Sequence, residues 1–175
     1  MKLINWVQFT WDLAALPPAP AELPEHYEIT PATAEDEKEM RRVITAAFSL
    51  DPEWNPTMHE VMQTIDGWLA DAFESDSKAA LVLRHGIRII GASVLSLDHE
   101  GDNHLAPGPC ILMEYRNRGF GTMLLDGSLR RLRENGFERA TGVAKENSPV
   151  TKFLYTKFGG TAAPHHATPL LAASA

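Results

Sequence analysis

A glycine-rich turn at residues 116–122 constrains this chain more than any other part of its sequence. The turn has the sequence Arg-Asn-Arg-Gly-Phe-Gly-Thr and follows a short apolar run at residues 110–112. Leu125, Leu129 and Leu132 then recur at the spacing of an amphipathic helix. The order of strand, glycine turn and helix start favours an anion, because the first N–H groups of a helix lack partners within it and the helix dipole is positive there.

Two familiar phosphate-binding motifs do not fit this turn. A dinucleotide fingerprint needs a third glycine three residues after Gly121, where Leu124 stands. A P-loop needs Gly-Lys followed by Ser or Thr, and the chain contains no such triplet. The form Arg-x-x-Gly-x-Gly, preceded by Glu114 and Tyr115, instead resembles the acyl-CoA pyrophosphate loop of the GCN5-related N-acetyltransferase (GNAT) family.

The segments on either side of the turn extend this resemblance over residues 27–160. The pattern Ile-x-Pro-Ala-Thr-x-x-Asp near the start of this range is similar to the first strand and helix start of the family. Beyond the loop helix, Asn147, Tyr155 and Gly159 match an Asn, a Tyr and a Gly of the family. Two departures stand beside these matches: the Asn-to-Tyr spacing is one residue longer than usual, and Gly160 replaces the usual Phe.

The resemblance implies an α/β fold with a mixed, mostly antiparallel central sheet flanked by helices. A splayed pair of strands would hold acyl-CoA in the gap between them. We expect a single acetyltransferase domain at residues 26–175, preceded by an aromatic arm and a proline-rich linker at residues 1–25. The sequence Ala-Pro-Gly-Pro at 106–109 predicts an unusually short strand before the loop. The arm holds three large aromatic residues in its first eleven positions, so we expect it to dock on the domain or on a second subunit.

The family pattern also implies which residues bind the acyl donor. Backbone N–H groups of the strand before the loop would hold the thioester carbonyl and the pantetheine arm, and the loop amides would bind the pyrophosphate with support from two arginines. Asn147 would bond to the pantetheine arm, or alternatively cap the helix that starts at Pro149. The predicted cofactor-binding residues are Ile111, Leu112, Met113, Arg116, Arg118, Gly119, Phe120, Gly121, Thr122 and Asn147.

By the same resemblance, Tyr155 is the predicted general acid. A phenol with a pKa of about 10 keeps its proton at neutral pH and can donate it to a departing thiolate. The alternative is a tyrosine that only packs on its helix. Asp98, Glu100 and His104 lie in the connection where the family often has a base; each is also readable as a solvated loop residue, and Glu100 is our candidate.

The distribution of charge suits an anionic cofactor and a cationic acceptor. The chain has a net charge of −7, yet residues 116–157 contain nine of the sixteen basic residues and four of the twenty-three acidic ones. The sequence contains neither a long basic tract nor an interleaving of aromatic and basic residues, so it does not indicate general nucleic-acid binding. The sequence has no apolar run of about 18 residues that predicts a membrane span and no histidine spacing that predicts a metal site. Cys110 is the single cysteine, which excludes an internal disulfide and fits a reducing, cytoplasmic compartment.

Together these features predict an acetyl-CoA-dependent N-acetyltransferase that moves an acetyl group directly to a primary amine. The acceptor would be a small-molecule or peptide amine, and the aromatic arm is compatible with a homodimer. Two other classes stay open from the sequence: a non-catalytic acyl-CoA sensor or regulatory module, and an interaction protein that uses the arm. The identity of the acceptor and the preferred acyl chain are not encoded in any motif.

Overall fold

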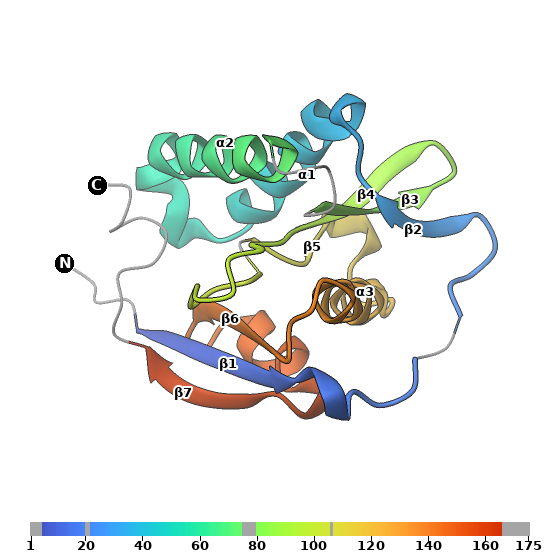
Figure 1. Cartoon of the computed structure of the whole chain (residues 1–175). Coiled ribbons are helices and arrows are strands. Elements are labelled where there is room, and N and C mark those ends of the chain that lie inside the picture. Colours follow the sequence, from blue (N-terminus) through green and yellow to red (C-terminus); the bar gives the residue numbers. More distant parts are fainter. Residues whose placement is uncertain (1–4, 20–21, 75–79, 106, 166–175) are drawn as a thin grey trace.

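Two antiparallel sheets and three α-helices make up the described part of the fold (Figure 1). The computed structural model describes residues 5–19, 22–74, 80–105 and 107–165. The strands are β1 (Trp6–Asp12), β2 (Tyr27–Pro31), β3 (Ala80–His85), β4 (Arg88–Val94), β5 (Cys110–Ile111), β6 (Arg139–Lys145) and β7 (Thr161–His165). The helices are α1 (Glu37–Ser49), α2 (Met58–Glu74) and α3 (Phe120–Glu134). Short helical turns are η1 (Leu13–Ala15), η2 (Ala34–Asp36), η3 (Pro52–Thr57), η4 (Met113–Tyr115), η5 (Val150–Leu154) and η6 (Lys157–Gly159).

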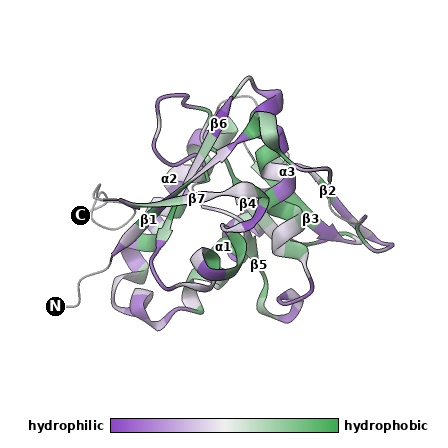
Figure 2. Ribbon diagram, turned by 90° about the horizontal axis from the view of Figure 1, so that it is seen from below, coloured by the Kyte–Doolittle hydropathy of each residue, from purple (hydrophilic) through white to green (hydrophobic). Residues whose placement is uncertain are grey.

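The first sheet has the strand order β2-β3-β4-β5, and each neighbouring pair is antiparallel. Helices α1 and α2 cover one face of it and α3 covers the other (Figure 1). Strand β4 is buried at every position after Arg88, because both of its faces are covered. The helices α1 and α3 carry hydrophobic and hydrophilic bands along their lengths (Figure 2), as helices that cover a sheet with one side must.

A register shift in this sheet falls at the glycine of β4. Leu83 pairs with Gly91 but Arg84 pairs with Ile89, so one residue of β4 is left over as a bulge. An added Cβ at Gly91 would lie 2.8 Å from Cδ1 of Ile111, which shows how closely β5 approaches at this point. The bulge therefore lies beside the glycine of an otherwise apolar strand.

The second sheet has the order β6-β1-β7, with the N-terminal strand in its centre. Trp6 pairs with Lys145 on one side and with His165 on the other. The aromatic arm therefore docks on the domain as an added strand of the same chain. Trp11 is fully buried in it, which stabilises the fold by roughly 4 kcal/mol at the usual value per unit of apolar area.

The two sheets diverge where β5 ends the first and β6 ends the second. The predicted α/β architecture with antiparallel strands flanked by helices is confirmed, although the strands form two sheets rather than one continuous sheet. Strand β5 has only two residues, as the Ala-Pro-Gly-Pro segment before it predicted. Within the described ranges, none of the helices is both long and apolar enough to cross a membrane.

Candidate functional site

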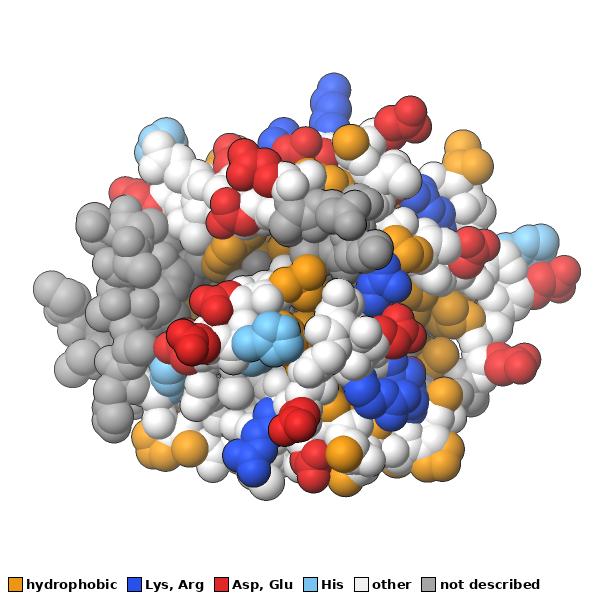
Figure 3. Space-filling model, in the orientation of Figure 1, with side chains coloured by type: hydrophobic (Ala, Val, Ile, Leu, Met, Phe, Trp, Pro, Cys, Tyr) orange, Lys and Arg blue, Asp and Glu red, His pale blue; other side chains and the backbone are white. Residues whose placement is uncertain are grey.

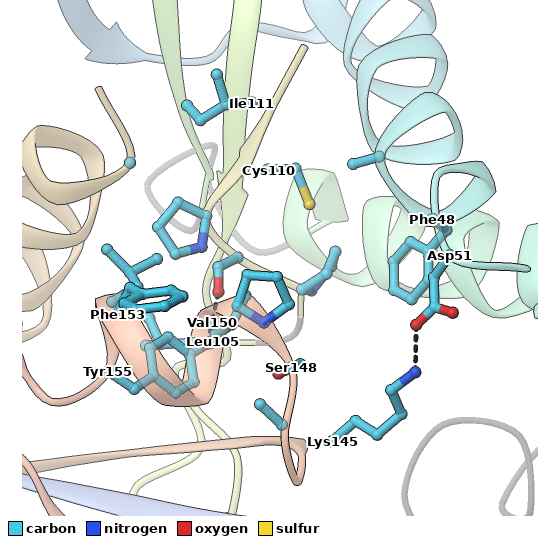
Figure 4. A pocket seen from close by; sticks show the side chains of 18 of the residues that line it. Phe48, Asp51, Leu105, Cys110, Ile111, Lys145, Ser148, Val150, Phe153 and Tyr155 are labelled. Atoms are coloured by element: carbon cyan, nitrogen blue, oxygen red, sulfur yellow. Dashed lines mark hydrogen bonds and ion pairs between the residues drawn. The ribbon is translucent and has the colours of Figure 1, made fainter. Parts of the chain in front are cut away.

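A cavity of about 850 Å³ opens between the diverging strands β5 and β6. Its walls come from parts of the chain that are far apart in sequence: β1, α1, η3, α2, β5, the 116–122 turn, β6 and η5. Figure 4 shows Cys110 and Ile111 on one wall, Tyr155 on a second and Phe48 with Asp51 on a third. The cavity thus joins the glycine turn to the end of the second sheet.

One end of the cavity, which we name the anion end, is formed by the glycine turn. Gly119 has φ +84° and directly precedes α3, and no side chain caps this helix. The N–H groups of the first turn of α3 therefore remain available to a ligand. The residues of the anion end are Arg116, Asn117, Gly119, Gly121 and Thr122.

Two predicted residues of the turn do not line the cavity with their side chains. Phe120 is buried at 4% exposure and stacks on Tyr27 with ring centroids 4.6 Å apart, so it can offer a ligand only its backbone N–H. The guanidinium of Arg118 lies 5.5 Å from the centre of the Tyr115 ring. Arg116, by contrast, lines the cavity, and its Nε donates to the carbonyl oxygen of Ile111 at 3.4 Å.

The backbone of β5 offers fewer donors than the sequence suggested. The N–H of Leu112 donates to the carbonyl oxygen of Ile90 at 2.9 Å, so it is used within the sheet. Because N–H groups alternate in direction along an antiparallel strand, the N–H of Ile111 points toward the gap beside β6. Met113 is 65% exposed and begins η4 outside the cavity lining. Three consecutive donors were expected, and strand geometry leaves Ile111 as the donor that faces the gap.

Tyr155 lies in the cavity wall with 2% of its surface exposed. Its hydroxyl donates to the carbonyl oxygen of Gly108 at 2.5 Å, and its ring meets the edges of Trp11 and Phe9 at 5.1 and 5.6 Å. A π-type turn carries it, since its N–H donates to the carbonyl oxygen of Val150 at 2.8 Å. Burial raises the pKa of Tyr155 well above its usual value, so the phenol stays protonated at neutral pH.

Asn147 also lines the cavity, in the turn between β6 and η5. Its φ of +63° is in the left-handed region, which Asn tolerates better than most residues. The hydroxyl of Ser148, rather than Asn147, accepts from the N–H of Thr151 at 3.3 Å. The capping role left open for Asn147 therefore belongs to its neighbour.

The opposite end of the cavity, which we name the aromatic end, was not predicted from the sequence. Lys145 extends from the last position of β6, where its ammonium donates to Asp51 (Figure 4). This ammonium also donates to Oε2 of Glu53 at 3.2 Å. The same ammonium lies 5.6 Å from the centre of the Trp54 ring. The residues of the aromatic end are Trp6, Phe48, Asp51, Trp54, Trp68 and Lys145.

A comparison with protein families matches this chain to the acetyltransferase (GNAT) family over residues 33–159. The chain belongs to the GNAT family. Members of this family are acetyl-CoA-dependent acyltransferases. No curated protein matches the chain at a significant level.

Solved GNAT structures share the fold at low sequence identity. A GCN5-related N-acetyltransferase from Sphaerobacter thermophilus has a TM-score of 0.68 and 18% identity, over 93% of this chain and 50% of its own. A GNAT-family acetyltransferase from Colwellia psychrerythraea has a TM-score of 0.64 and 13% identity, over 93% of this chain and 54% of its own. A GNAT-family acetyltransferase from Brucella melitensis, solved in complex with acetyl-CoA, has a TM-score of 0.50 and 23% identity, over 65% of this chain and 73% of its own. The chain therefore spans about half the length of the first two structures.

The three candidate bases that the sequence suggested lie outside the cavity lining: Asp98, Glu100 and His104. Glu100 is exposed, and its N–H donates to Oδ1 of Asp98 at 3.1 Å in a solvated turn. His104 is buried: its Nδ1 accepts from the N–H of Thr141 at 3.0 Å, so its Nε2 carries the proton and donates to the carbonyl oxygen of Asp98, also at 3.0 Å. Burial lowers the pKa of His104. This histidine fastens the 98–104 loop to β6, and its ring has no nitrogen left for substrate.

The cavity also contains a cysteine, and its chemistry is restrained by burial. Cys110 is 8% exposed, and burial raises the pKa of its thiol to about 12 although Arg116 opposes the shift. The thiolate that a nucleophile would require is therefore scarce at neutral pH. In residues 5–19, 22–74, 80–105 and 107–165, no group of three or more His, Cys, Asp or Glu is arranged to hold a metal ion.

Proposed function

We propose that this chain is an N-acetyltransferase that moves the acetyl group of acetyl-CoA directly to a primary amine. The observation that carries the proposal is that one cavity contains both the uncapped start of α3 and the buried hydroxyl of Tyr155. The helix start suits the pyrophosphate of CoA, and the hydroxyl suits the departing sulfur. The acceptor is a small-molecule or peptide amine, and a reducing, cytoplasmic location fits the single buried cysteine.

In this proposal the amides of Gly119 to Thr122 bind the pyrophosphate, and Arg116 adds a charge-assisted hydrogen bond. Arg118 reinforces the same charge from outside the cavity. The N–H of Ile111 donates to the thioester carbonyl or to the pantetheine arm, and Asn147 bonds to that arm beside η5. These donors are fixed before the ligand arrives, so they stabilise developing negative charge without reorganising.

The chemical step then needs one acid and a neutral amine. The acceptor ammonium first gives a proton to water, and its nitrogen lone pair forms a bond to the thioester carbonyl carbon. As the carbon–sulfur bond breaks, its electron pair goes to sulfur, which takes the proton of Tyr155. The new amide nitrogen gives up its extra proton, which returns the phenol to its starting state through water. Because the hydroxyl of Tyr155 has a single proton, it releases the Gly108 carbonyl oxygen when it serves the sulfur.

The base is the open element of this scheme. Glu100 lies in a solvated loop outside the cavity lining, so as a base it would have to act through water. Deprotonation by bulk water needs no fixed residue and is the simpler proposal. A Glu100→Gln variant separates the two: an unchanged pH–rate profile supports water, and a loss of turnover that is rescued at high pH supports Glu100.

Two measurements test the proposed function. Acetyl-CoA at roughly 100 times its dissociation constant should stabilise the fold by about 2.7 kcal/mol, whereas NADH and ATP should not. Tyr155→Phe should lower turnover by about 100-fold or more while the affinity for acetyl-CoA stays the same. Tyr27→Phe is the control, because Tyr27 is partly buried, stacks on Phe120 and lies outside the cavity.

The outcomes separate the enzyme from the sensor. Binding of acetyl-CoA without acetylation of any amine would favour a non-catalytic acyl-CoA sensor. An absence of stabilisation by acetyl-CoA at millimolar concentration would contradict both the enzyme and the sensor hypothesis. Equal losses in the two Tyr→Phe variants would assign Tyr155 to packing rather than to proton transfer.

A further inference from the structure

Residues 104 and 105 join the two sheets at the closed end of the gap between β5 and β6. The N–H of Ser96, just after β4, donates to the carbonyl oxygen of His104 at 3.0 Å, and Leu95 pairs with Leu105 in an antiparallel bridge. On the other side, the N–H of His104 donates to the carbonyl oxygen of Thr141 of β6 at 2.7 Å. The gap that contains the cavity therefore opens beyond these two residues.

Side chains of this connection cover the edge of β6 that faces the gap. The N–H of Thr141 donates to Nδ1 of His104 at 3.0 Å, and the N–H of Val143 donates to Oδ1 of Asn103 at 3.2 Å. Because N–H groups alternate in direction along a strand, these two belong to the edge that faces away from β1. Strand β5 cannot pair with donors that are already used, so Asn103 helps to hold the gap open.

The hydrogen bonds of Asn103 fix the orientation of its amide. Its Oδ1 also accepts from the N–H of Leu105 at 3.2 Å, so two backbone donors meet the same atom, and that atom must be the oxygen. Within the part of the chain that the structure describes, Nδ2 of Asn103 has no acceptor. The side chain is partly exposed and lines the cavity. With Oδ1 held on β6, Nδ2 is the atom left to face the cavity.

Asn103 also lies close to the ring of Tyr155. A Cβ at Gly142 would lie 3.1 Å from Cε2 of Tyr155 and 3.2 Å from Cδ1 of Leu105, so these two side chains meet at Gly142. Oδ1 of Asn103 bonds to the N–H of Leu105 and to that of the residue after Gly142. The same connection supplies the carbonyl oxygen of Gly108 that holds the Tyr155 hydroxyl. The amide of Asn103 and the proposed acid are therefore neighbours in the cavity wall.

We propose that Nδ2 of Asn103 donates a hydrogen bond to the thioester carbonyl oxygen of the acyl donor. The inference rests on the proposed function and adds a catalytic residue to it. Because the carbonyl carbon is bonded to the sulfur that Tyr155 serves, the closeness of the two side chains favours this carbonyl over the amides of the pantetheine arm. The N–H of Ile111 faces the same gap from β5, so the oxygen has one donor from each wall.

The two donors act on the charge that develops during the transfer. When the amine nitrogen bonds to the carbonyl carbon, the π electrons of the carbonyl move to its oxygen, and they return as the carbon–sulfur bond breaks. No proton leaves Asn103 in either step. Its amide is neutral and is oriented by two backbone bonds before the ligand arrives, so it stabilises the negative oxygen without reorganising.

The test separates the two roles of the Asn103 amide. Asn103→Asp keeps an oxygen for the two backbone N–H groups but has no amide protons, so it removes only the donation to the ligand. Asn103→Ala removes both roles. Asn135→Asp makes the same chemical change outside the cavity, where Nδ2 of Asn135 donates to the carbonyl oxygen of Arg131 at 2.8 Å.

The ligands are acetyl-CoA and S-ethyl-CoA, which has a methylene group in place of the thioester carbonyl. Calorimetry on the whole chain measures both dissociation constants, and thermal unfolding reports whether each variant is folded. Infrared spectra of bound acetyl-CoA, labelled with a heavy carbon isotope at the carbonyl, measure the strength of the hydrogen bonds to that oxygen. An added negative charge repels the pyrophosphate of both ligands alike, so the ratio of the two dissociation constants isolates the carbonyl contact.

Asn103→Asp should keep the thermal midpoint of the wild-type chain and weaken the binding of acetyl-CoA relative to S-ethyl-CoA by about three- to tenfold. The carbonyl band of bound acetyl-CoA should move to higher wavenumber in Asn103→Asp and in Asn103→Ala, because the carbonyl loses a donor. Asn135→Asp should leave the ratio and the band as they are in the wild-type chain.

Other results overturn the inference. An equal loss for both ligands with an unmoved band would assign Asn103 to the pantetheine arm or to the electrostatics of the phosphates. An unchanged ratio and band in a folded Asn103→Asp variant would show that Nδ2 does not contact the ligand.

The wild-type chain provides a test that needs no variant. If the carbonyl band of bound acetyl-CoA lies as high as that of S-ethyl thioacetate with the same label in hexane, no donor serves the oxygen and the inference fails even where the Asn103 variants do not fold. A failure of both CoA derivatives to bind would instead contradict the proposed function itself.

Discussion

Replacing Gly160 by alanine tests the packing that holds Tyr155 in the cavity wall. A Cβ at this position would overlap the carbonyl oxygen of Tyr155 and lie 2.7 Å from Nε1 of Trp11. Neither neighbour can yield cheaply: one is backbone, and the other belongs to a fully buried ring whose Nε1 donates to the carbonyl oxygen of Lys157 at 3.0 Å. Overpacking costs about 1–3 kcal/mol in general, and with backbone as the obstacle we expect the free energy of unfolding to fall by about 3 kcal/mol.

Thermal unfolding measures this effect directly. For a chain of this length, a loss of about 3 kcal/mol lowers the midpoint by about 6–12 °C. Gly67→Ala is the matched control, because Gly67 is exposed within α2 and a Cβ there meets nothing within 4 Å. That variant should gain about 0.5–1 kcal/mol, since alanine loses less backbone entropy than glycine in a helix. An unchanged midpoint for Gly160→Ala would refute the described packing of β1 against η6.

Two further predictions concern buried groups. Burial lowers the pKa of His104 in the folded chain below its usual value of 6.5, so below that pH the unfolded chain binds a proton more readily than the folded chain does. The free energy of unfolding should therefore be full above a pH of about 6.5 and fall as the pH drops below it. Urea unfolding at pH 7.5 and 5.5 measures this fall, which should be smaller in His104→Asn. The Cys110 thiol should react slowly with a thiol reagent in the folded chain, more slowly still with acetyl-CoA bound, and at the rate of a free thiol in urea; rapid reaction of the folded chain would contradict its burial.

Much of the fold could be predicted from the sequence because its signals are local. The leucine spacing of α3 and the glycine at its N-terminus act within one or two turns, so they predict this helix wherever it packs. The proline-rich segment before β5 shortens that strand for an equally local reason. The departure at Gly160 has its explanation in a contact that no local pattern contains, since the space that a side chain would need is filled by Trp11.

The candidate site was predicted only in part, and the omissions have a common cause. The residues of the anion end are nearly consecutive in sequence, and one motif identifies them. Asp51 and Trp54 are neighbours in sequence, but Lys145 follows Asp51 by 94 positions, across several helices and strands, so only the packing of η3 against β6 brings the three together. The mixture of acidic and basic side chains on the face shown in Figure 3 likewise indicates that the charge asymmetry of the sequence does not become one uniform patch on that face.

The sequence by itself determined the family, the helix start that suits an anion, and the presence of an aromatic arm whose packing partner it did not specify. Only the tertiary structure decided where the arm lies. An alternating apolar strand can pair with any exposed edge, because its period says nothing about its partner. The choice between edges depends on what the rest of the chain leaves open, and here β6 and β7 leave a place for β1 between them. That placement brings Trp11 against Tyr155 and Trp6 against Trp54, and so completes both the packing behind the proposed acid and the wall of the aromatic end.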